Sequence, residues 1–210
     1  MSEARTGQAP DREPGRQAAG KAGPSDKPPV AQRVRDAARE LFYRQGIHAT
    51  GVDEICRAAG TTKMGLYRAY PSKDALIETI LQERCDAQEK LACITGDRSL
   101  SPRERLLACV NMAAATVLTP GFRGCPLGLA IAEFPDPHHP ARQVADHHKQ
   151  AMRETLRCLC AEAGAPATLG DSLQLLIEGA FAVAPALGNE AASRALESSA
   201  HTLIEASLPG

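Results

Sequence analysis

The sequence predicts an all-α protein, made of a small N-terminal helical domain over residues 29–75 and a larger helical domain over residues 76–210. Apolar side chains recur at intervals of three and four residues from Val30 onward, which is the spacing of one face of an α-helix. Aromatic residues make up only 3% of the chain, and Val, Ile and Thr form no alternating runs of the kind that strands require. Gly and Pro stand between the helical segments, where they end one helix and precede the next.

Residues 1–28 differ in composition from the rest of the chain. They are rich in Gly, Pro and Ala, carry mixed charge and hold hardly any large apolar side chains. Such a segment cannot bury enough apolar surface to offset the conformational entropy lost on folding, so we expect a disordered tail. A supplementary contact of its Lys and Arg side chains with DNA is the alternative.

The next two helices are expected on either side of a loop that starts at Gly46. The first helix ends at this glycine, and the second begins at Val52 or the residue before it, because Thr50 and Asp53 have the spacing of a capping box. Gly60 ends the second helix, since glycine adopts a positive φ without steric cost. The apolar face of the second helix is formed by Val52, Ile55, Cys56 and Ala59.

A third, short helix follows directly. Thr61 and Thr62 offer hydroxyl caps for its start, and Pro71 stops it. Two helices joined by a short turn that contains glycine form a helix-turn-helix, in which the second helix enters the major groove of DNA. The exposed residues of this expected reading helix are phosphate donors and small or amphipathic side chains: Thr62, Lys63, Met64, Gly65, Tyr67 and Arg68. An ordinary helical corner with a solvated basic face is the alternative.

A fourth helix is expected to begin after Ser72, with Lys73 in its first turn. A cation at this position opposes the helix dipole, so the lysine needs another reason to be there. A DNA phosphate that contacts both Lys73 and the backbone N–H groups of this helix end would be such a reason. A solvated lysine is the alternative.

Charge is unevenly distributed although the net charge is only −1. Residues 30–75 carry eight Lys/Arg against five Asp/Glu, whereas residues 76–210 carry eleven against sixteen. A basic part joined to an acidic part is typical of a DNA-binding head on a body that avoids DNA.

The larger domain is expected to contain helices over residues 101–118, 126–134, 140–163, 169–187 and 189–206. The helix over 169–187 has apolar residues around most of its circumference, which the surface of a monomer would not tolerate. We therefore expect a homodimer in which two such helices from each subunit form a four-helix bundle; burial within one subunit is the alternative. The expected dimer contacts are Leu173, Leu176, Ile177, Ala180, Phe181, Ala195, Leu196 and Leu203.

The seven cysteines argue for a reducing compartment. Their number is odd and no C-x-x-C pair occurs, so neither a disulfide framework nor a zinc ribbon is expected. The longest apolar run, near residues 175–187, is interrupted by Glu178 and is too short to cross a bilayer. We expect a cytoplasmic protein without a membrane anchor.

Two consecutive stretches carry a family resemblance. A-R-E-L-F-Y-R-Q-G at 38–46 and A-T-G-V-D-E-I-C-R-A-A-G-T-T-K-M-G-L-Y-R-A-Y-P-S-K-D-A-L at 49–76 resemble the N-terminal domain of the TetR family of transcriptional regulators. The resemblance implies a repressor that binds a palindromic double-stranded DNA operator and is released by a small-molecule inducer. Together with the helix-turn-helix pattern it indicates these DNA contacts: Thr50, Thr61, Thr62, Lys63, Met64, Gly65, Tyr67, Arg68 and Lys73.

The chain departs from the family pattern at Met64 and Ala69, so we expect base specificity of its own. In the larger domain, R-G-C-P-L at 123–127 and A-E-F at 132–134 resemble one recurrent subgroup whose ligands are not uniform. The expected ligand pocket lies where apolar residues converge with few polar groups, at Met112, Ala115, Thr116, Phe122, Cys125, Leu129 and Glu133; a plain core is the alternative.

Two sensor hypotheses stand beside the ligand-responsive repressor. Cys125, next to a Gly and close to Arg123, would sense oxidants or electrophiles, with a buried inert cysteine as the alternative. A metal site for zinc or nickel would use His138, His139, His147 and His148 with Asp136 and Glu133, with a solvated surface as the alternative. No nucleophile lies in a recognisable catalytic motif, so we expect no enzyme, no cofactor and no resident metal.

Overall fold

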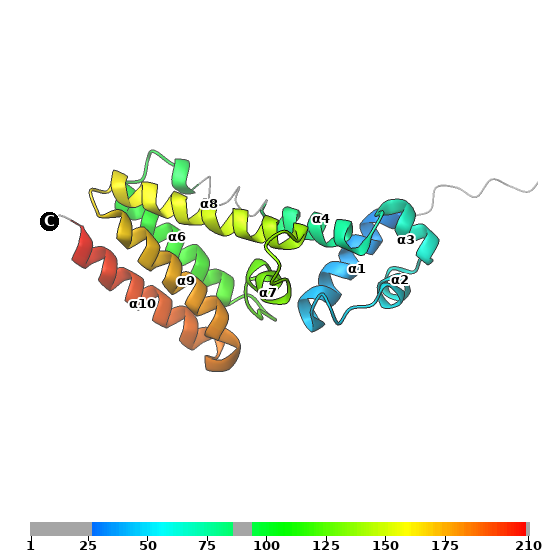
Figure 1. Cartoon of the computed structure of the whole chain (residues 1–210). Coiled ribbons are helices and arrows are strands. Elements are labelled where there is room, and N and C mark those ends of the chain that lie inside the picture. Colours follow the sequence, from blue (N-terminus) through cyan, green and yellow to red (C-terminus); the bar gives the residue numbers. More distant parts are fainter. Residues whose placement is uncertain (1–26, 86–93, 209–210) are drawn as a thin grey trace, which may run out of the picture.

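The computed structural model describes residues 27–85 and 94–208, and all but the end of the tail expected over 1–28 lies outside this part. Within the described ranges every regular element is a helix, so the all-α prediction is confirmed. Figure 1 shows an elongated molecule, with α1 to α3 at one end and the bundle of α6, α9 and α10 at the other. Within the same ranges no helix is both long and apolar enough to traverse a bilayer.

The N-terminal head consists of α1 (Val30–Gln45), α2 (Val52–Ala59) and α3 (Lys63–Ala69). Gly46 follows α1 with a φ of 98°, and Gly60 follows α2 in the left-handed conformation, as their positions in the sequence predicted. The three helices enclose an apolar core whose fully buried members are Val34, Ala38, Ile55 and Leu66.

The loop between α1 and α2 corrects one prediction. The N-cap of α2 is Gly51, which has no side chain to accept a hydrogen bond, so the capping box of Thr50 and Asp53 is wrong. Thr50 is only 1% exposed, and its hydroxyl donates to the carbonyl of Gly46 over 2.7 Å. That bond satisfies a backbone acceptor at the end of α1, because a buried carbonyl needs a partner. The side chain of Thr50 is therefore not available to DNA.

The core of the head continues into the body. The helix α4 (Lys73–Cys85) begins after Ser72, whose hydroxyl accepts from the amide of Ala75, as expected of a cap. The same apolar cluster contains Leu76 and Ile77 of α4, two residues of α7 (Pro126–Glu133), and Ala141 at the start of α8 (Pro140–Glu162). Packing thus crosses the domain boundary predicted at residue 75.

The body is a second core between the later half of α8 and three further helices: α6 (Pro102–Val117), α9 (Ala167–Leu187) and α10 (Asn189–Ser207). Ser101 and Glu104 form a complete capping box at the start of α6. The helices α8 and α9 cross closely at Gly170, where a Cβ atom would lie 2.7 Å from the backbone nitrogen of Arg157.

Half of the residues predicted to contact a second copy belong instead to this second core. Leu173, Ile177, Ala180 and Leu196 are buried inside the single chain, so they cannot contact a second copy. The apolar residues of α9 surround the helix because one side packs on α8 and α10 of the same subunit, which is the alternative considered above. Leu203 and Ala195 remain exposed, and Leu176 and Phe181 are half-buried.

Candidate functional site

The reading helix α3 is short and lies at the far end of the head (Figure 1). Thr62 is its N-cap, and its hydroxyl accepts from the amide of Gly65 over 3.2 Å. Gly65 is required for close packing, since a Cβ atom there would overlap the hydroxyl of Thr61. Met64 is 75% exposed and Tyr67 is 46% exposed, so a long thioether and a phenol project from this helix without an intramolecular role in the core.

Lys63 connects the surfaces of α2 and α3. Its ammonium lies 2.9 Å from the carboxylate of Asp53, and both side chains are exposed. The hydrogen bond to Asp53 raises the pKa of Lys63, so the lysine remains a cation over the whole physiological range. The ion pair therefore joins the exposed surfaces of α2 and α3, and the contact of Lys63 with a DNA phosphate stays a prediction.

Lys73 makes contacts within the chain that the sequence did not predict. Its ammonium donates to the carbonyl of Ile47 over 2.6 Å and lies 5.8 Å from the centre of the Phe42 ring. Partial burial lowers its pKa, opposed by the charges of Glu133 and Asp74. The side chain is half-buried and bonded to the loop of the head, so its contacts give Lys73 a structural role, and its contact with a DNA phosphate stays a prediction.

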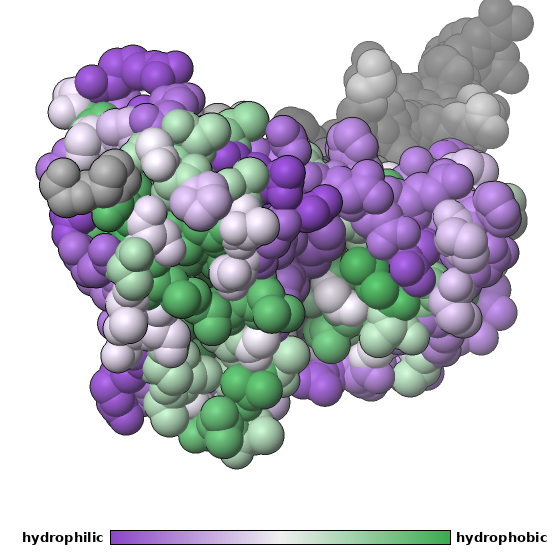
Figure 2. All heavy atoms as spheres, turned by 60° about the vertical axis from the view of Figure 1, so that its left-hand side comes forward, coloured by the Kyte–Doolittle hydropathy of each residue, from purple (hydrophilic) through white to green (hydrophobic). Residues whose placement is uncertain are grey.

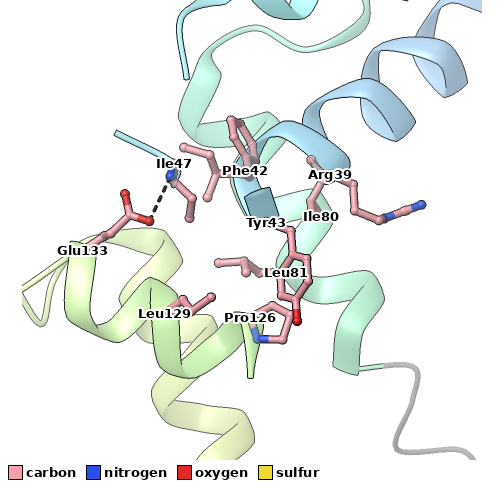
Figure 3. Close-up of a pocket in the computed structure, with 10 residues that line it drawn as sticks. Arg39, Phe42, Tyr43, Ile47, Ile80, Leu81, Pro126, Leu129 and Glu133 are labelled. Atoms are coloured by element: carbon pink, nitrogen blue, oxygen red, sulfur yellow. Dashed lines mark hydrogen bonds between the residues drawn. The ribbon is translucent and has the colours of Figure 1, made fainter. Parts of the chain in front are cut away.

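Glu133 fixes the same loop from the body. It stands at the end of α7, and its carboxylate accepts from the amide of Ile47 over 2.9 Å (Figure 3). It also accepts from the amide of His48 over 2.7 Å. The ring of His48 also lies 3.0 Å from the carbonyl of Glu133. The prediction that this carboxylate lines the ligand pocket is therefore wrong, because two backbone donors of the head hold both of its oxygens.

A second junction forms at Tyr43 near the end of α1. Its hydroxyl accepts from the amide of Arg123 and donates to the carbonyl of Gly124. The guanidinium of Arg123 in turn donates to the carbonyl of Tyr43 over 2.8 Å. The segment before α7 is therefore bonded to α1, just as the end of α7 is bonded to the loop after α1.

Between these junctions lies a small cavity of about 30 Å³, shown in Figure 3. Leu129 and Glu133 line it together with Phe42, Tyr43 and Ile47 of the head. This volume is that of about one water molecule. Leu129, predicted as a ligand contact, therefore belongs to the packing between head and body.

A cavity of about 450 Å³ lies in the body and is large enough for a small organic ligand. It is enclosed by α6, α7, α8, α9 and the loop before α7. Five of the seven predicted pocket residues meet in its wall: Met112, Ala115, Thr116, Phe122 and Cys125. Most of the remaining wall is apolar, from Cys109, Ala113, Leu127, Met152, Leu156, Ile177 and Phe181.

One corner of this cavity is polar, and the sequence analysis missed it. Lys149 of α8 donates to the carboxylate of Glu178 of α9 over 2.5 Å and to the sulfur of Cys125 over 3.3 Å. His148 adjoins this group, and burial together with the charge of Lys149 lowers its pKa, so the imidazole is neutral at pH 7. Cys125, Lys149 and Glu178 are widely separated in the sequence, so no local sequence pattern predicts their contact.

The predicted metal site is not formed. His139 accepts from the amide of Ala141 at the start of α8 and stacks on the ring of Phe134 at 4.0 Å between centroids. His148 faces the cavity instead. In the parts of the chain that the structure describes, no three His, Cys, Asp or Glu side chains converge as metal ligands would. The arrangement of His138, His139, His147 and His148 therefore gives the metal-sensor hypothesis no support.

Comparison with known proteins identifies the class of this architecture. Residues 34–80 match the family of bacterial regulatory proteins, tetR family. A TetR-family transcriptional regulator from Streptomyces coelicolor has a similar structure, with a TM-score of 0.80 and 27% identity over 85% of this chain and 95% of its own. A solved structure from Streptomyces avermitilis, assigned to the same regulators, is 31% identical over 85% of this chain and 97% of its own, with a TM-score of 0.73. The chain belongs to the TetR family.

This TetR-family protein is thus a DNA-binding transcriptional regulator. The curated relative YjdC of Escherichia coli (strain K12), an HTH-type transcriptional regulator, is 27% identical over 153 residues, which are 70% of this chain and 78% of that protein. The family match covers α1 to α3 and the first part of α4, which is the region that carries the reading helix and Lys73. The homologues are regulators rather than enzymes.

The contrast between Lys63 and Lys73 yields a testable prediction. Lys63→Met should weaken DNA binding about tenfold and reduce the slope of log affinity against log salt by about one, because one phosphate contact is lost. Lys73→Met should leave that slope unchanged and lower the free energy of unfolding by about 1–2 kcal/mol, because the bond to Ile47 is lost. Fluorescence anisotropy across a salt series and chemical denaturation measure the two effects. Equal losses of slope in both variants would contradict these assignments.

Proposed function

We propose that this regulator is a homodimeric repressor that binds a palindromic operator and is released when a small molecule enters the cavity of the body. The observation that carries the proposal is the position of α7: its first residues line the cavity, and its last residue holds the DNA-binding head. The repressor role is further supported by DhaR of Mycobacterium sp. (strain GP1), a transcriptional repressor 31% identical over 101 residues, about half of each chain.

The route from cavity to head is short. Cys125, Pro126 and Leu127 line the cavity, while Arg123 and Gly124 just before them are bonded to Tyr43 of α1. A ligand that pushes this segment outward would shift α7 as a unit, because a packed helix transmits displacement rather than absorbing it. The head would then turn relative to the body, and operator affinity would fall in proportion to the ligand's preference for the shifted state.

Dimerisation is supported by the outer face of α9 and α10. On α9, Leu175 is 74% exposed, Leu187 is 63% exposed and Val183 is 41% exposed. Figure 2 shows apolar side chains gathered over the body, against the largely polar surface of the rest. Small exposed residues on the same helices permit close approach of a second copy. They are Ala182 and Ala186 on α9 and Ala191, Ala195 and Ala206 on α10. A two-fold dimer through this face must hold its two reading helices about 34 Å apart to enter successive major grooves.

The DNA flanking the chain's own gene provides a test of operator binding and dimerisation. We expect tight, salt-sensitive binding of a dimer to a palindromic site. Leu175→Glu and Val183→Glu should weaken dimerisation at least about tenfold, because each would bury a charge in an apolar interface, and operator binding should fall with it. Sedimentation and fluorescence anisotropy measure the two quantities. Leu118→Glu is the matched control, since Leu118 is a leucine that is 50% exposed on another element, the C-cap of α6. A dimer that survives both α9 variants would refute this interface.

Replacement of Glu133 by Gln tests the coupling. The carboxylate of Glu133 accepts hydrogen bonds from the amides of Ile47 and His48 through both of its oxygens. Gln has only one acceptor oxygen, so its NH2 group would face one of these two backbone N–H groups and lose that bond. We expect the Ile47 and His48 amides to exchange with solvent at least about tenfold faster, and operator affinity to fall because the heads are no longer held. Hydrogen exchange read by mass spectrometry reports the first effect. Glu190→Gln, at an exposed site on α10, should change neither; unaltered exchange in Glu133→Gln would argue against the junction.

Thiol sensing by Cys125 is a second candidate function, favoured by its contact with Lys149. The ammonium of Lys149 donates to the sulfur of Cys125, and a neighbouring cation is typical of the surroundings of reactive cysteines. Cys158, by contrast, donates to the carboxylate of Glu154, and its pKa is raised. Burial raises the pKa of Cys109 and Cys160 to about 11. We infer that an electrophile reaching the cavity would modify Cys125 first among these four.

N-ethylmaleimide at one equivalent tests this candidate. The sulfur adds to one alkene carbon, the carbon–carbon π bond breaks, and the thiol proton passes to the neighbouring carbon. We expect peptide mapping to place the adduct on Cys125 and operator affinity to fall at least about tenfold, because the adduct occupies the cavity. Cys125→Ser should keep operator binding and lose the response. Labelling that starts at Cys158, or release that persists in Cys125→Ser, would exclude the candidate.

A further inference from the structure

We propose that the cavity of the body takes an uncharged aromatic compound with one hydrogen-bond-accepting oxygen, such as a ketone, directed at Lys149. This inference rests on the proposed function, since it names the class of ligand for the same cavity. It is carried by the shape and chemistry of the wall, which combine a mostly apolar surface with a single polar corner that is already neutral in charge.

The apolar wall favours a flat ring. Phe122 and Phe181 meet in it with ring centroids 5.5 Å apart and a tilt of 60°, so an aromatic ligand finds both a ring face and a ring edge. Met112 and Met152 stand on α6 and α8, and their flexible thioethers adapt to the outline of a planar molecule. A cavity of about 450 Å³ accommodates a compound of two or three fused rings.

The polar corner offers donors to a ligand. An ammonium has three N–H groups, and in the described part of the chain Glu178 and Cys125 accept from that of Lys149. One N–H is thus left for an acceptor in the cavity. The Nδ1 atom of His148 is buried and has no partner among the described residues. An oxygen of the ligand placed here would satisfy groups that are costly to leave unpaired.

The charge of the corner excludes ionic ligands. Lys149 and Glu178 lie 2.5 Å apart, with side chains that are 17% and 32% exposed. An anion beside Lys149 would also lie beside the carboxylate of Glu178, and a cation beside Glu178 would lie beside the ammonium. For an anionic or a cationic ligand, the attraction to one residue of the pair and the repulsion from the other nearly cancel. The loss of water around the charge of the ligand still opposes its burial. A neutral acceptor has no such penalty.

Three compounds of the same shape test this inference. The compounds 2-isopropylnaphthalene, 2-acetylnaphthalene and 2-naphthoate differ only in whether the substituent is a hydrocarbon, a ketone or a carboxylate, and none of them alkylates thiols. Equilibrium dialysis against the full-length protein measures their affinities. For the wild type we expect the ketone to bind at least about tenfold more tightly than the carboxylate.

Two variants isolate the two parts of the argument. Lys149→Met combined with Glu178→Gln removes both charges together, so that no unpaired charge is buried. It should weaken the ketone about tenfold and leave the hydrocarbon unchanged, because only the hydrogen bond is lost. Glu178→Gln alone leaves Lys149 without a counter-charge and should strengthen binding of the carboxylate at least about tenfold. Glu154→Gln, an exposed change on α8 away from this cavity, is the control for net charge.

The outcomes separate this inference from the proposed function. Wild-type protein that binds the carboxylate as well as the ketone, or binds none of the three, would overturn the inference. So would a double variant in which ketone and hydrocarbon change alike. Operator binding measured on the same samples without any compound confirms that each variant is folded. If the wild type bound the compounds but not the operator, the proposed regulatory role would be wrong, and the inference about the chemistry of the cavity would stand.

Discussion

The structure depends on how the backbone of one residue, Ile47, is held. The loop after α1 has no helix to satisfy its backbone, so the amide of Ile47 donates to Glu133 and its carbonyl accepts from Lys73. The two charged residues come from α7 and α4, which makes the loop a meeting point of head and body. Because charged partners give the stronger hydrogen bonds, the head is fixed at the place where α1 turns into the helix-turn-helix.

The same arrangement joins two functions in α7. This helix has only eight residues, yet Pro126 at its start lines the large cavity and Glu133 at its end holds the loop of the head. A displacement at one end therefore reaches the other without a long chain of intermediates. The cavity itself is mostly apolar, so the ligand that we propose for it would act by filling space, and the Lys149–Glu178 pair would select its chemistry.

Much of the fold follows from local signals. Helix ends were predicted where capping or glycine fixes them within a few residues, as at Thr62, Gly60 and Ser101. The family resemblance rested on an ungapped run that is itself a local structure, the helix-turn-helix. Five of the seven residues expected in a ligand pocket line one cavity, because the residues of α6 and the following loop lie close together in the sequence.

What the sequence by itself determined is the all-α class, the position of each described helix and the family. Only the tertiary structure decided what each polar or apolar side chain contacts. Thr50 and Lys73 turn inward because backbone carbonyls of the loop needed donors, and Glu133 reaches a loop 85 residues away. Leu173 is buried by its own subunit although its helix has apolar residues on most sides. Periodicity shows which face of a helix is apolar, but the partner that covers a face, or pairs with a charge, is chosen by contacts distant in sequence.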